Sequence, residues 1–147
     1  MSDPKTENRK AKNGKNPGAL ESIRDFTDLV AWQLGRELRK RVYEITRRFP
    51  PDEKHVLVAQ LRRAAISVTA NVAEGYGRFS YLENIQFCRH ARGSAYEVRD
   101  HLTTALDAGH LPRTDWDEAE ALAKRVIQVL NGYIRSTRER QEKARQA

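Results

Sequence analysis

Apolar residues recur at steps of three and four along four separate stretches of the chain, which is the spacing of one face of an α-helix. We expect helices at about residues 28–48, 51–74, 81–108 and 115–134. The first of these stripes contains Val30, Leu34, Leu38, Val42, Ile45 and Phe49. Short connections between amphipathic helices are typical of antiparallel neighbours. The pattern therefore predicts an all-α fold, an antiparallel up-down four-helix bundle.

Proline, glycine and capping residues mark the ends of these helices. Pro50 should stop the first helix, and Pro51 suits the first turn of the second. Gly75 and Gly77 are expected to end the second helix in the left-handed conformation that glycine adopts easily. Ser80–Glu83 has the form of a capping box for the third helix, which Gly109 should end.

Polar residues run beside the apolar stripes of the second and third helices. The two rows are Gln60, Arg63, Ser67, Asn71 and Glu74, and Glu83, Phe87, His90, Ser94, Glu97 and His101. A hydrogen-bonded seam that fixes helix register or a subunit contact explains such rows more simply than a ligand or catalytic row. Since the two helices are antiparallel, we expect Arg62 or Arg63 to pair with Glu97. Breaking that pair should cost about 3–5 kcal/mol if it is buried and about 0–1 kcal/mol if it is exposed.

The composition is that of one helical domain without a membrane span. The chain has 147 residues, of which 39% are hydrophobic and 32% charged. No apolar run approaches the ~20 residues that a bilayer requires, and no signal peptide is recognised. The single cysteine, Cys88, excludes an internal disulfide framework and favours a reducing, cytoplasmic location. It lies at helical spacing from Ala91 and Ala95, which indicates a small core residue rather than a nucleophile.

The net charge of +7 is concentrated at the two ends of the chain. Residues 1–24 carry six Lys and Arg against three acids, and residues 135–147 carry five against two, so each end contributes +3. We divide the chain into a disordered basic arm (1–25), the bundle (26–137), and a basic tail or helix extension (138–147). The arm is either a solvated tail or a segment that contacts nucleic acid.

Signals of catalysis, metals and cofactors are weak. No two of the four histidines are four residues apart, and none follows a glutamate at the spacing used in bundle metal sites. Nucleophile, phosphate-loop and paired-cysteine motifs are missing as well. We therefore expect no catalytic residue, metal or cofactor. An enzyme built on Glu74, His90 and Glu97 is the weakest alternative.

Five segments together resemble the four-helix-bundle proteins encoded in intervening sequences of bacterial 23S rRNA genes, a family sometimes mislabelled S23 ribosomal protein. They are FTDLVAWQ, FPPDE, QLRRAAISVTANVAEGYGR, FCRHARGSAYEV and VLNGYIRS. The resemblance covers about residues 26–137. Thr69 stands where many relatives carry proline, which implies a straighter second helix.

The resemblance implies a homo-oligomer, assembled as a pentameric barrel, without enzymatic activity. Related bundle proteins serve as accessory factors of retroelement reverse transcriptases, so a reverse transcriptase or another protein is a possible partner. Residues that match the family, together with Arg62, are then architectural or interface positions. They are Gln60, Arg62, Arg63, Ser67, Asn71, Glu74, Gly75, Arg78, Arg92, Gly93, Ser94 and Glu97.

Charge and resemblance together give the functional hypothesis, a non-enzymatic oligomer that binds RNA or structured nucleic acid through its phosphates. The expected contacts are Arg9, Lys10, Lys12 and Lys15 of the arm, Arg36, Arg39, Lys40 and Arg47 of the first helix, and Arg135, Arg138 and Arg140 of the tail. No stacking aromatics stand out, so strong base specificity is not expected. The alternative is a protein-interaction scaffold with no nucleic-acid role.

Overall fold

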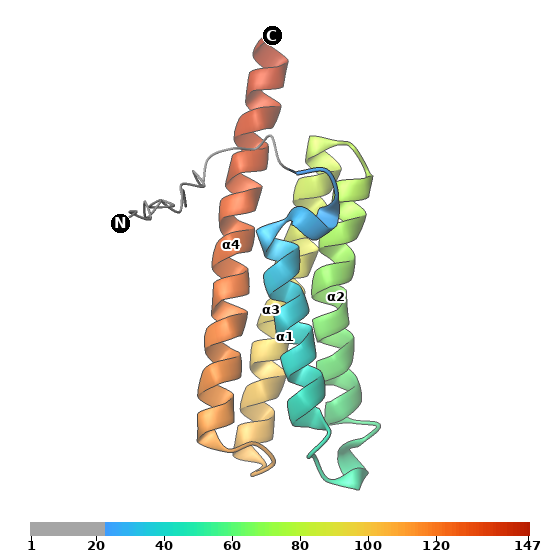
Figure 1. Ribbon diagram of the computed structural model, residues 1–147, viewed down its shortest axis with the longest axis vertical. Coiled ribbons are helices and arrows are strands. Elements are labelled where there is room, and N and C mark those ends of the chain that lie inside the picture. Colours follow the sequence, from blue (N-terminus) through green and yellow to red (C-terminus); the bar gives the residue numbers. More distant parts are fainter. Residues whose placement is uncertain (1–22) are drawn as a thin grey trace, which may run out of the picture.

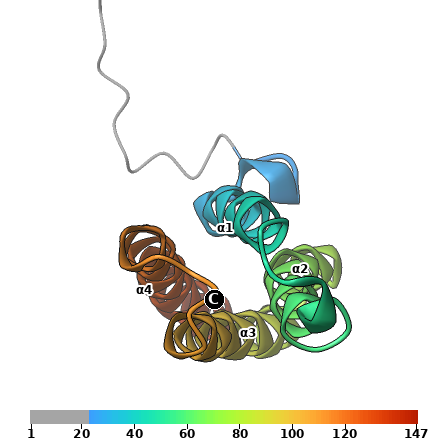
Figure 2. The ribbon, with the colours of Figure 1, turned by 90° about the horizontal axis from the view of Figure 1, so that it is seen from below.

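The computed structural model describes residues 23–147, which form four α-helices and two single-turn 3₁₀ helices. Their bounds are η2 Phe26–Asp28, α1 Val30–Thr46, η3 Pro51–Glu53, α2 Leu57–Gly77, α3 Tyr81–Asp107 and α4 Arg113–Gln146. Successive helices run in opposite directions (Figure 1), and in the end view they stand at the corners of a square in chain order (Figure 2). The predicted all-α, four-helix architecture is confirmed. The arm residues expected to contact nucleic acid lie outside the described residues.

The core is formed by the predicted stripes, with large aliphatic residues alternating with alanines. Leu38, Leu61, Leu102 and Leu130 are fully buried, one from each helix. Small residues also face inward on three helices and let the backbones approach closely; they are Ala64, Ala65, Ala91, Ala95, Ala119 and Ala123. Of the first stripe, Leu38, Val42, Ile45 and Phe49 are buried as predicted.

The start of the first stripe was predicted wrongly. Val30 is 55% exposed and Leu34 only half-buried, whereas Ala31 and Gly35 face the core. A step of four residues turns an α-helix about 40° past a full circle. Two such steps back from Leu38 therefore carry Val30 about 80° around the helix, away from the core.

Both ends of the second helix also differ from prediction. Pro51 begins the separate turn η3. Val56, with φ −114° and ψ −93°, has a non-helical backbone, and α2 begins after it at Leu57. At the other end Gly75 and Gly77 lie within α2, and the left-handed residue is Phe79, with φ +55°. Gly75 is buried against α3, so a close helix contact, not helix termination, explains glycine there.

The ends of the third helix follow prediction more closely. The Ser80 hydroxyl accepts a hydrogen bond from the backbone N–H of Glu83 (3.4 Å), and Gly109 has φ +77°. At the start of the bundle, Asp25 is the N-cap of η2, and α1 begins after Leu29 without a side-chain cap.

The fourth helix is longer than the periodic stripe alone indicated. It continues through residues 138–147 as far as Gln146 and projects beyond the ends of the other helices (Figure 1). The choice between a tail and a helix extension is therefore settled in favour of the extension. Its last two turns have only solvent-exposed and half-buried residues, so charged groups there are carried on a regular rod.

Candidate nucleic-acid interface

The polar rows of α2 and α3 meet through hydrogen bonds at two places. At one, the Ser94 hydroxyl donates to the Ser67 hydroxyl (2.8 Å), and the Asn71 amide donates to the Ser67 carbonyl and hydroxyl (2.8 and 2.9 Å). At the other, Arg63 binds both Gln60 and Glu97. The geometry is that of a seam between two helices whose polar groups satisfy one another.

The predicted pairing with Glu97 is confirmed for Arg63 and wrong for Arg62. The Arg63–Glu97 pair is on the surface, with side chains 55% and 36% exposed. Arg62 faces α1 instead, where its Nε donates to the Thr46 hydroxyl (3.0 Å) and its guanidinium lies 4.5 Å from the centre of the Tyr43 ring. Successive residues on a helix are 100° apart, so these two arginines point to opposite neighbours.

The remaining residues of the expected interface set contact several helices. Glu74 pairs with Arg78 within α2 (2.8 Å), and the Arg78 guanidinium also lies 5.3 Å from the Phe87 ring. Arg92 donates to Asn131 of α4 (2.8 Å), so it belongs to the α3–α4 contact. Gly93 is exposed and has open space beside it.

Basic residues gather on the face where α1 and α2 lie side by side. We call this set the basic face; it consists of Arg36, Arg39, Lys40, Arg47 and Arg62. A groove of about 550 Å³ lies within it and is lined by Arg39, Lys40, Tyr43, Glu44, Arg47 and Ile66. Among residues 23–147, no carboxylate forms an ion pair with any of the five except Glu37, which is 3.8 Å from Lys40.

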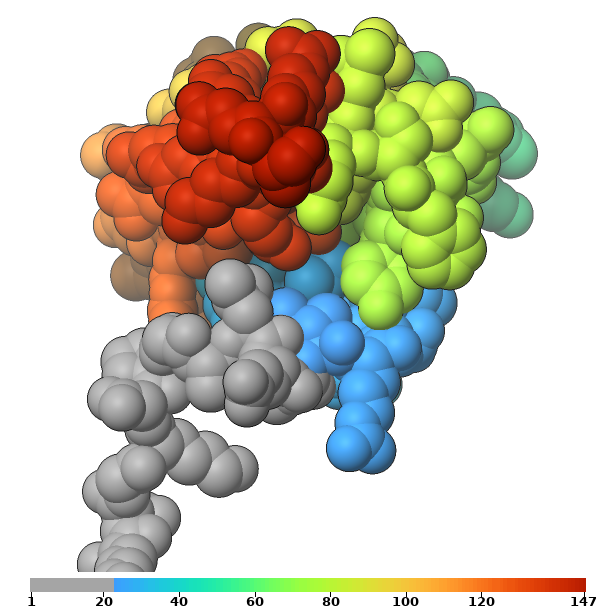
Figure 3. Space-filling view, turned by 90° about the horizontal axis from the view of Figure 1, so that it is seen from above, coloured from blue at the N-terminus to red at the C-terminus, as the bar shows by residue number. Residues whose placement is uncertain are grey.

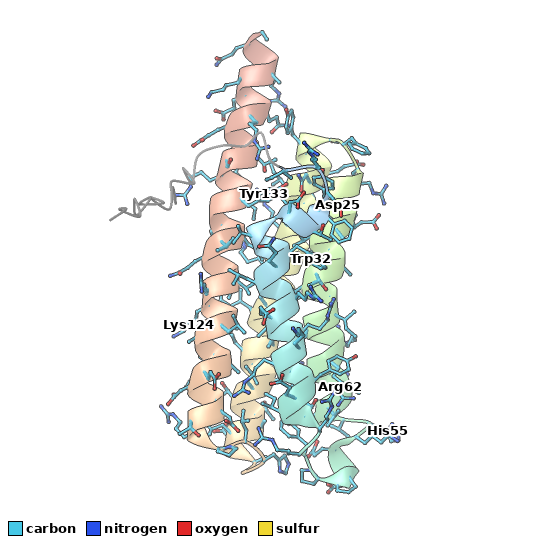
Figure 4. All side chains as sticks on the ribbon, in the orientation of Figure 1. Asp25, Trp32, His55, Arg62, Lys124 and Tyr133 are labelled. Carbon is cyan, nitrogen blue, oxygen red and sulfur yellow. The ribbon has the colours of Figure 1, made fainter. Side chains whose placement is uncertain are left out.

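Two arginines of the basic face are held in place by neutral partners. Arg39 donates from Nη1 to the Thr69 hydroxyl (2.9 Å), and Thr69 is almost fully buried in an unbroken α2. Arg62 is fixed by Thr46 and Tyr43 and lies in the lower half of the bundle (Figure 4). Because these partners carry no charge, these contacts do not neutralise either guanidinium group.

The opposite flank of α1 has equally basic residues, but they are neutralised. Arg41 contacts Glu44 (3.2 Å), Asp115 (3.5 Å) and Glu118 (2.7 Å), and Arg48 contacts Asp115 (2.8 Å). The bonds to Asp115 and Glu118 join this part of the chain to α4. The bundle is therefore nearly neutral overall, although the arginines on one flank of α1 are paired with acids and those on the other flank are not.

The basic residues expected in the C-terminal segment lie along the last part of α4. Arg135 and Arg138 are exposed, and neither forms an ion pair with another described residue. Arg140 is half-buried, donates to the Ser136 hydroxyl (3.4 Å), and lies 6.0 Å from the centre of the Tyr133 ring. Arg135 and Arg138 are therefore accessible to a ligand, whereas Arg140 is packed against its neighbours.

Sequence reasoning missed two features of this arrangement. Arg62 was assigned to the polar seam, although the buried α2 residues Leu61 and Ala65 place it on the other flank of that helix. It also missed the partly buried pair of Arg99 and Glu120, whose Nε–Oε1 distance is 2.8 Å and which joins α3 to α4. Glu120 has few exposed atoms, and an acidic residue inside an apolar stripe was the available signal.

The groups considered for catalysis or metal binding do not converge. Within residues 23–147 no three His, Cys, Asp or Glu side chains are placed to hold a metal ion. Glu74 and Glu97 are each paired with an arginine, and the His90 ring lies 6.2 Å from that of Phe87.

No helix among residues 23–147 is both long and apolar enough to cross a bilayer.

Cys88 is a core residue, as predicted. Its thiol is fully buried, and burial raises its pKa from 9.0 to about 12.

Only the thiolate is nucleophilic, so at pH 8 the native Cys88 thiol should be alkylated by iodoacetamide roughly a thousandfold more slowly than in urea. Raising the pH from 8 to 10 should continue to accelerate native labelling after labelling of the unfolded chain has levelled off. Rapid labelling of native protein at pH 8 would contradict the burial of this thiol.

Comparison with known proteins places this arrangement among related sequences. Residues 27–132 match the family described as 23S rRNA-intervening sequence protein. A crystal structure of a protein of unknown function from the S23 ribosomal protein family of Bacteroides thetaiotaomicron shares the fold, with a TM-score of 0.66 and 19% identity. The alignment covers 71% of this chain and 98% of that one. A search of curated proteins gives no significant match.

Proposed function

Because the chain belongs to the 23S rRNA-intervening sequence protein family, we propose that it is a non-enzymatic, homo-oligomeric RNA-binding protein. The observation that carries the proposal is the basic face, where Arg36, Arg39 and Arg47 of the α1 segment meet Arg62 of α2 without a carboxylate partner in the described chain. Phosphate oxygens are the natural acceptors for guanidinium groups left unpaired.

The way these arginines are held favours a polyanion as the ligand. Thr69, Thr46 and Tyr43 fix two guanidinium groups through neutral contacts, which reduces the conformational entropy lost on binding. Arginine and lysine side chains that neutralise phosphates release the counterions condensed on the RNA, and this makes the affinity depend strongly on salt. The basic face would therefore bind the RNA backbone with little preference for sequence.

Oligomer formation would multiply these contacts. The outward side of α2 has exposed apolar residues, Ala59, Ile66 and Ala70, beside the basic face, and this supports a contact between copies. A pentamer would have five times the 16.9 kDa mass of the chain, which sedimentation velocity measures directly. Several basic faces and projecting α4 segments on one particle could bind a long RNA more tightly than any one of them.

The test is charge reversal on the basic face, followed by fluorescence anisotropy with labelled RNA over a range of salt. Arg36→Glu/Arg47→Glu should lower the affinity at least tenfold at about 150 mM salt. The slope of log affinity against log salt should fall by about 1.4, because each lost contact with a single strand contributes about 0.7. Both residues are exposed, so the fold should be retained.

The matched control is Arg89→Glu/Arg125→Glu, which alters two exposed, unpaired arginines on the outer surfaces of α3 and α4. Both double variants lower the net charge from +7 by four units, so a difference between them reports position and not total charge. Equal losses would mean that binding follows net charge alone, and the basic face would then have no special role. Reversing Arg9, Lys10, Lys12 and Lys15 in the same assay measures the contribution of the arm.

A protein-interaction scaffold is the second candidate, because the apolar outer side of α2 could equally receive a protein partner such as a reverse transcriptase. Absence of RNA binding by wild-type protein even at low salt would favour this alternative. Ile66→Glu would then separate the two uses of the surface. Conversion to a monomer identifies a contact between copies, and an unchanged oligomer that loses a captured partner identifies a docking site.

A further inference from the structure

A second cavity lies at the end of the bundle from which α4 projects. It has a volume of about 250 Å³ and lies between the α2–α3 turn and α4. Its walls include Tyr76, Phe79, Tyr81, Asn84, Tyr133 and Arg140. Viewed from above, the turn and α4 stand side by side at this end of the molecule (Figure 3), and Tyr133 lies at this level (Figure 4). We call this cavity the aromatic cleft.

The aromatic residues of the turn are exposed in a way that packing does not explain. Phe79 is 92% exposed and adopts φ +55°, a conformation that is uncommon for a bulky side chain and easy for glycine. Tyr81, two residues later, is 42% exposed. Flat rings displayed at the mouth of a cavity are suited to receive another flat ring.

The charge at the cleft is positive and partly unpaired. The Nε of Arg140 is buried without a hydrogen-bond acceptor, and Arg140 forms no ion pair with a described carboxylate. A ligand that combines an aromatic ring with an adjacent anion would therefore complement the site.

Polar groups inside the cleft can contact the edge of such a ring. The Asn84 amide donates to the Tyr133 hydroxyl (3.0 Å), so that hydroxyl can still donate its own proton. Burial raises the pKa of Tyr133, which keeps this donor protonated. The volume is below the range of about 300–1,000 Å³ usual for small-molecule sites, so it suits a single ring rather than a large ligand.

We propose that the aromatic cleft binds an unpaired nucleobase of RNA, with Phe79 and Tyr81 stacking on the base and Arg140 contacting an adjoining phosphate. This inference rests on the proposed function and deepens it by naming single-stranded RNA as the preferred ligand. The basic face would hold any RNA backbone, whereas the cleft would discriminate, since a base inside a duplex cannot reach it.

The test compares a labelled single strand of about 12 nucleotides with a duplex of the same length, at about 150 mM salt. Phe79→Gly/Tyr81→Ala removes both rings, and glycine accepts the left-handed conformation at position 79. Single-strand affinity should fall at least tenfold, while duplex affinity stays within twofold. Tyr96→Ala is the matched control, because it removes an aromatic that is 51% exposed on α3 and lies outside the cleft.

Each outcome separates this inference from the proposed function. If wild-type protein binds neither RNA at low salt, the proposed function itself fails. If both RNAs bind and the double variant weakens neither, or weakens both equally, only the base-binding cleft is overturned. A change in sedimentation with unchanged RNA binding would assign the exposed rings to a contact between copies and would overturn the cleft as well.

Discussion

Replacing Arg99 with methionine should lower the free energy of unfolding by about 3 kcal/mol, the low end of the range for breaking a buried ion pair. Arg99 donates from Nε to Glu120 Oε1 at 2.8 Å. The Glu120 side chain is only 9% exposed and that of Arg99 is 29% exposed, which places the cost at the lower limit. The other carboxylate oxygen of Glu120 is buried without a hydrogen-bond partner. Without the guanidinium the carboxylate would have only Lys124, 3.9 Å away, so a nearly buried charge would be left poorly compensated.

The exposed pair between α2 and α3 is the control. Arg63→Met breaks the bond to Glu97, where both partners are at the surface, and should cost no more than about 1 kcal/mol. Urea unfolding of both variants at one protein concentration gives the comparison, because assembly makes stability depend on concentration. Arg99→Met/Glu120→Leu should recover most of the loss. Equal costs for Arg99→Met and Arg63→Met would show that solvent already compensates Glu120.

The contrast between these pairs shows what the sequence could predict. A short connection makes α2 and α3 antiparallel, so counting residues outward from the turn placed Arg63 opposite Glu97. The same count from the short α3–α4 connection brings Arg99 opposite Glu120, since α3 ends at Asp107 and α4 begins at Arg113, but it was not made for that pair. The burial of Glu120 could not be inferred from such a count, since it depends on how all four helices surround the pair. Periodicity predicts which residues share one face of a helix better than it predicts how far a polar group is buried.

The basic face could be predicted in part from the sequence, and the aromatic cleft could not. Arg36, Arg39, Lys40 and Arg47 were recognised because one helix carries them close together in sequence. Their significance came only from the structure. Among the described residues the three arginines have no carboxylate partner and Lys40 has only Glu37, whereas Arg41 and Arg48 bind acids of α4. The cleft combines the α2–α3 turn with α4 residues more than fifty positions away. Stacking aromatics were therefore not anticipated from the chain alone.

Replacing Gly75 with alanine should lower the free energy of unfolding by about 1–3 kcal/mol, the usual cost of overpacking. A Cβ there would lie 2.9 Å from the Phe87 Cβ and 3.2 Å from the Asn84 carbonyl oxygen. The Asn84 carbonyl belongs to the α3 backbone, and the Phe87 Cβ is bonded to the Phe87 Cα of that backbone. Neither atom can move alone, so α3 itself would have to shift. Chemical denaturation gives the cost, and the α2–α3 seam near Asn71 should lose amide protection from hydrogen exchange.

Gly93→Ala provides the opposite result in a neighbouring helix. A Cβ at Gly93 meets no atom within 4 Å, so only the backbone effect remains. Alanine is favoured over glycine in a helix interior by up to about 1 kcal/mol, and this variant should therefore be more stable than wild type. The two substitutions are chemically identical and should shift the unfolding midpoint in opposite directions. If Gly75→Ala also stabilised the protein, α2 and α3 would have to lie further apart than the geometry at Gly75 indicates, and glycine would have no packing role there.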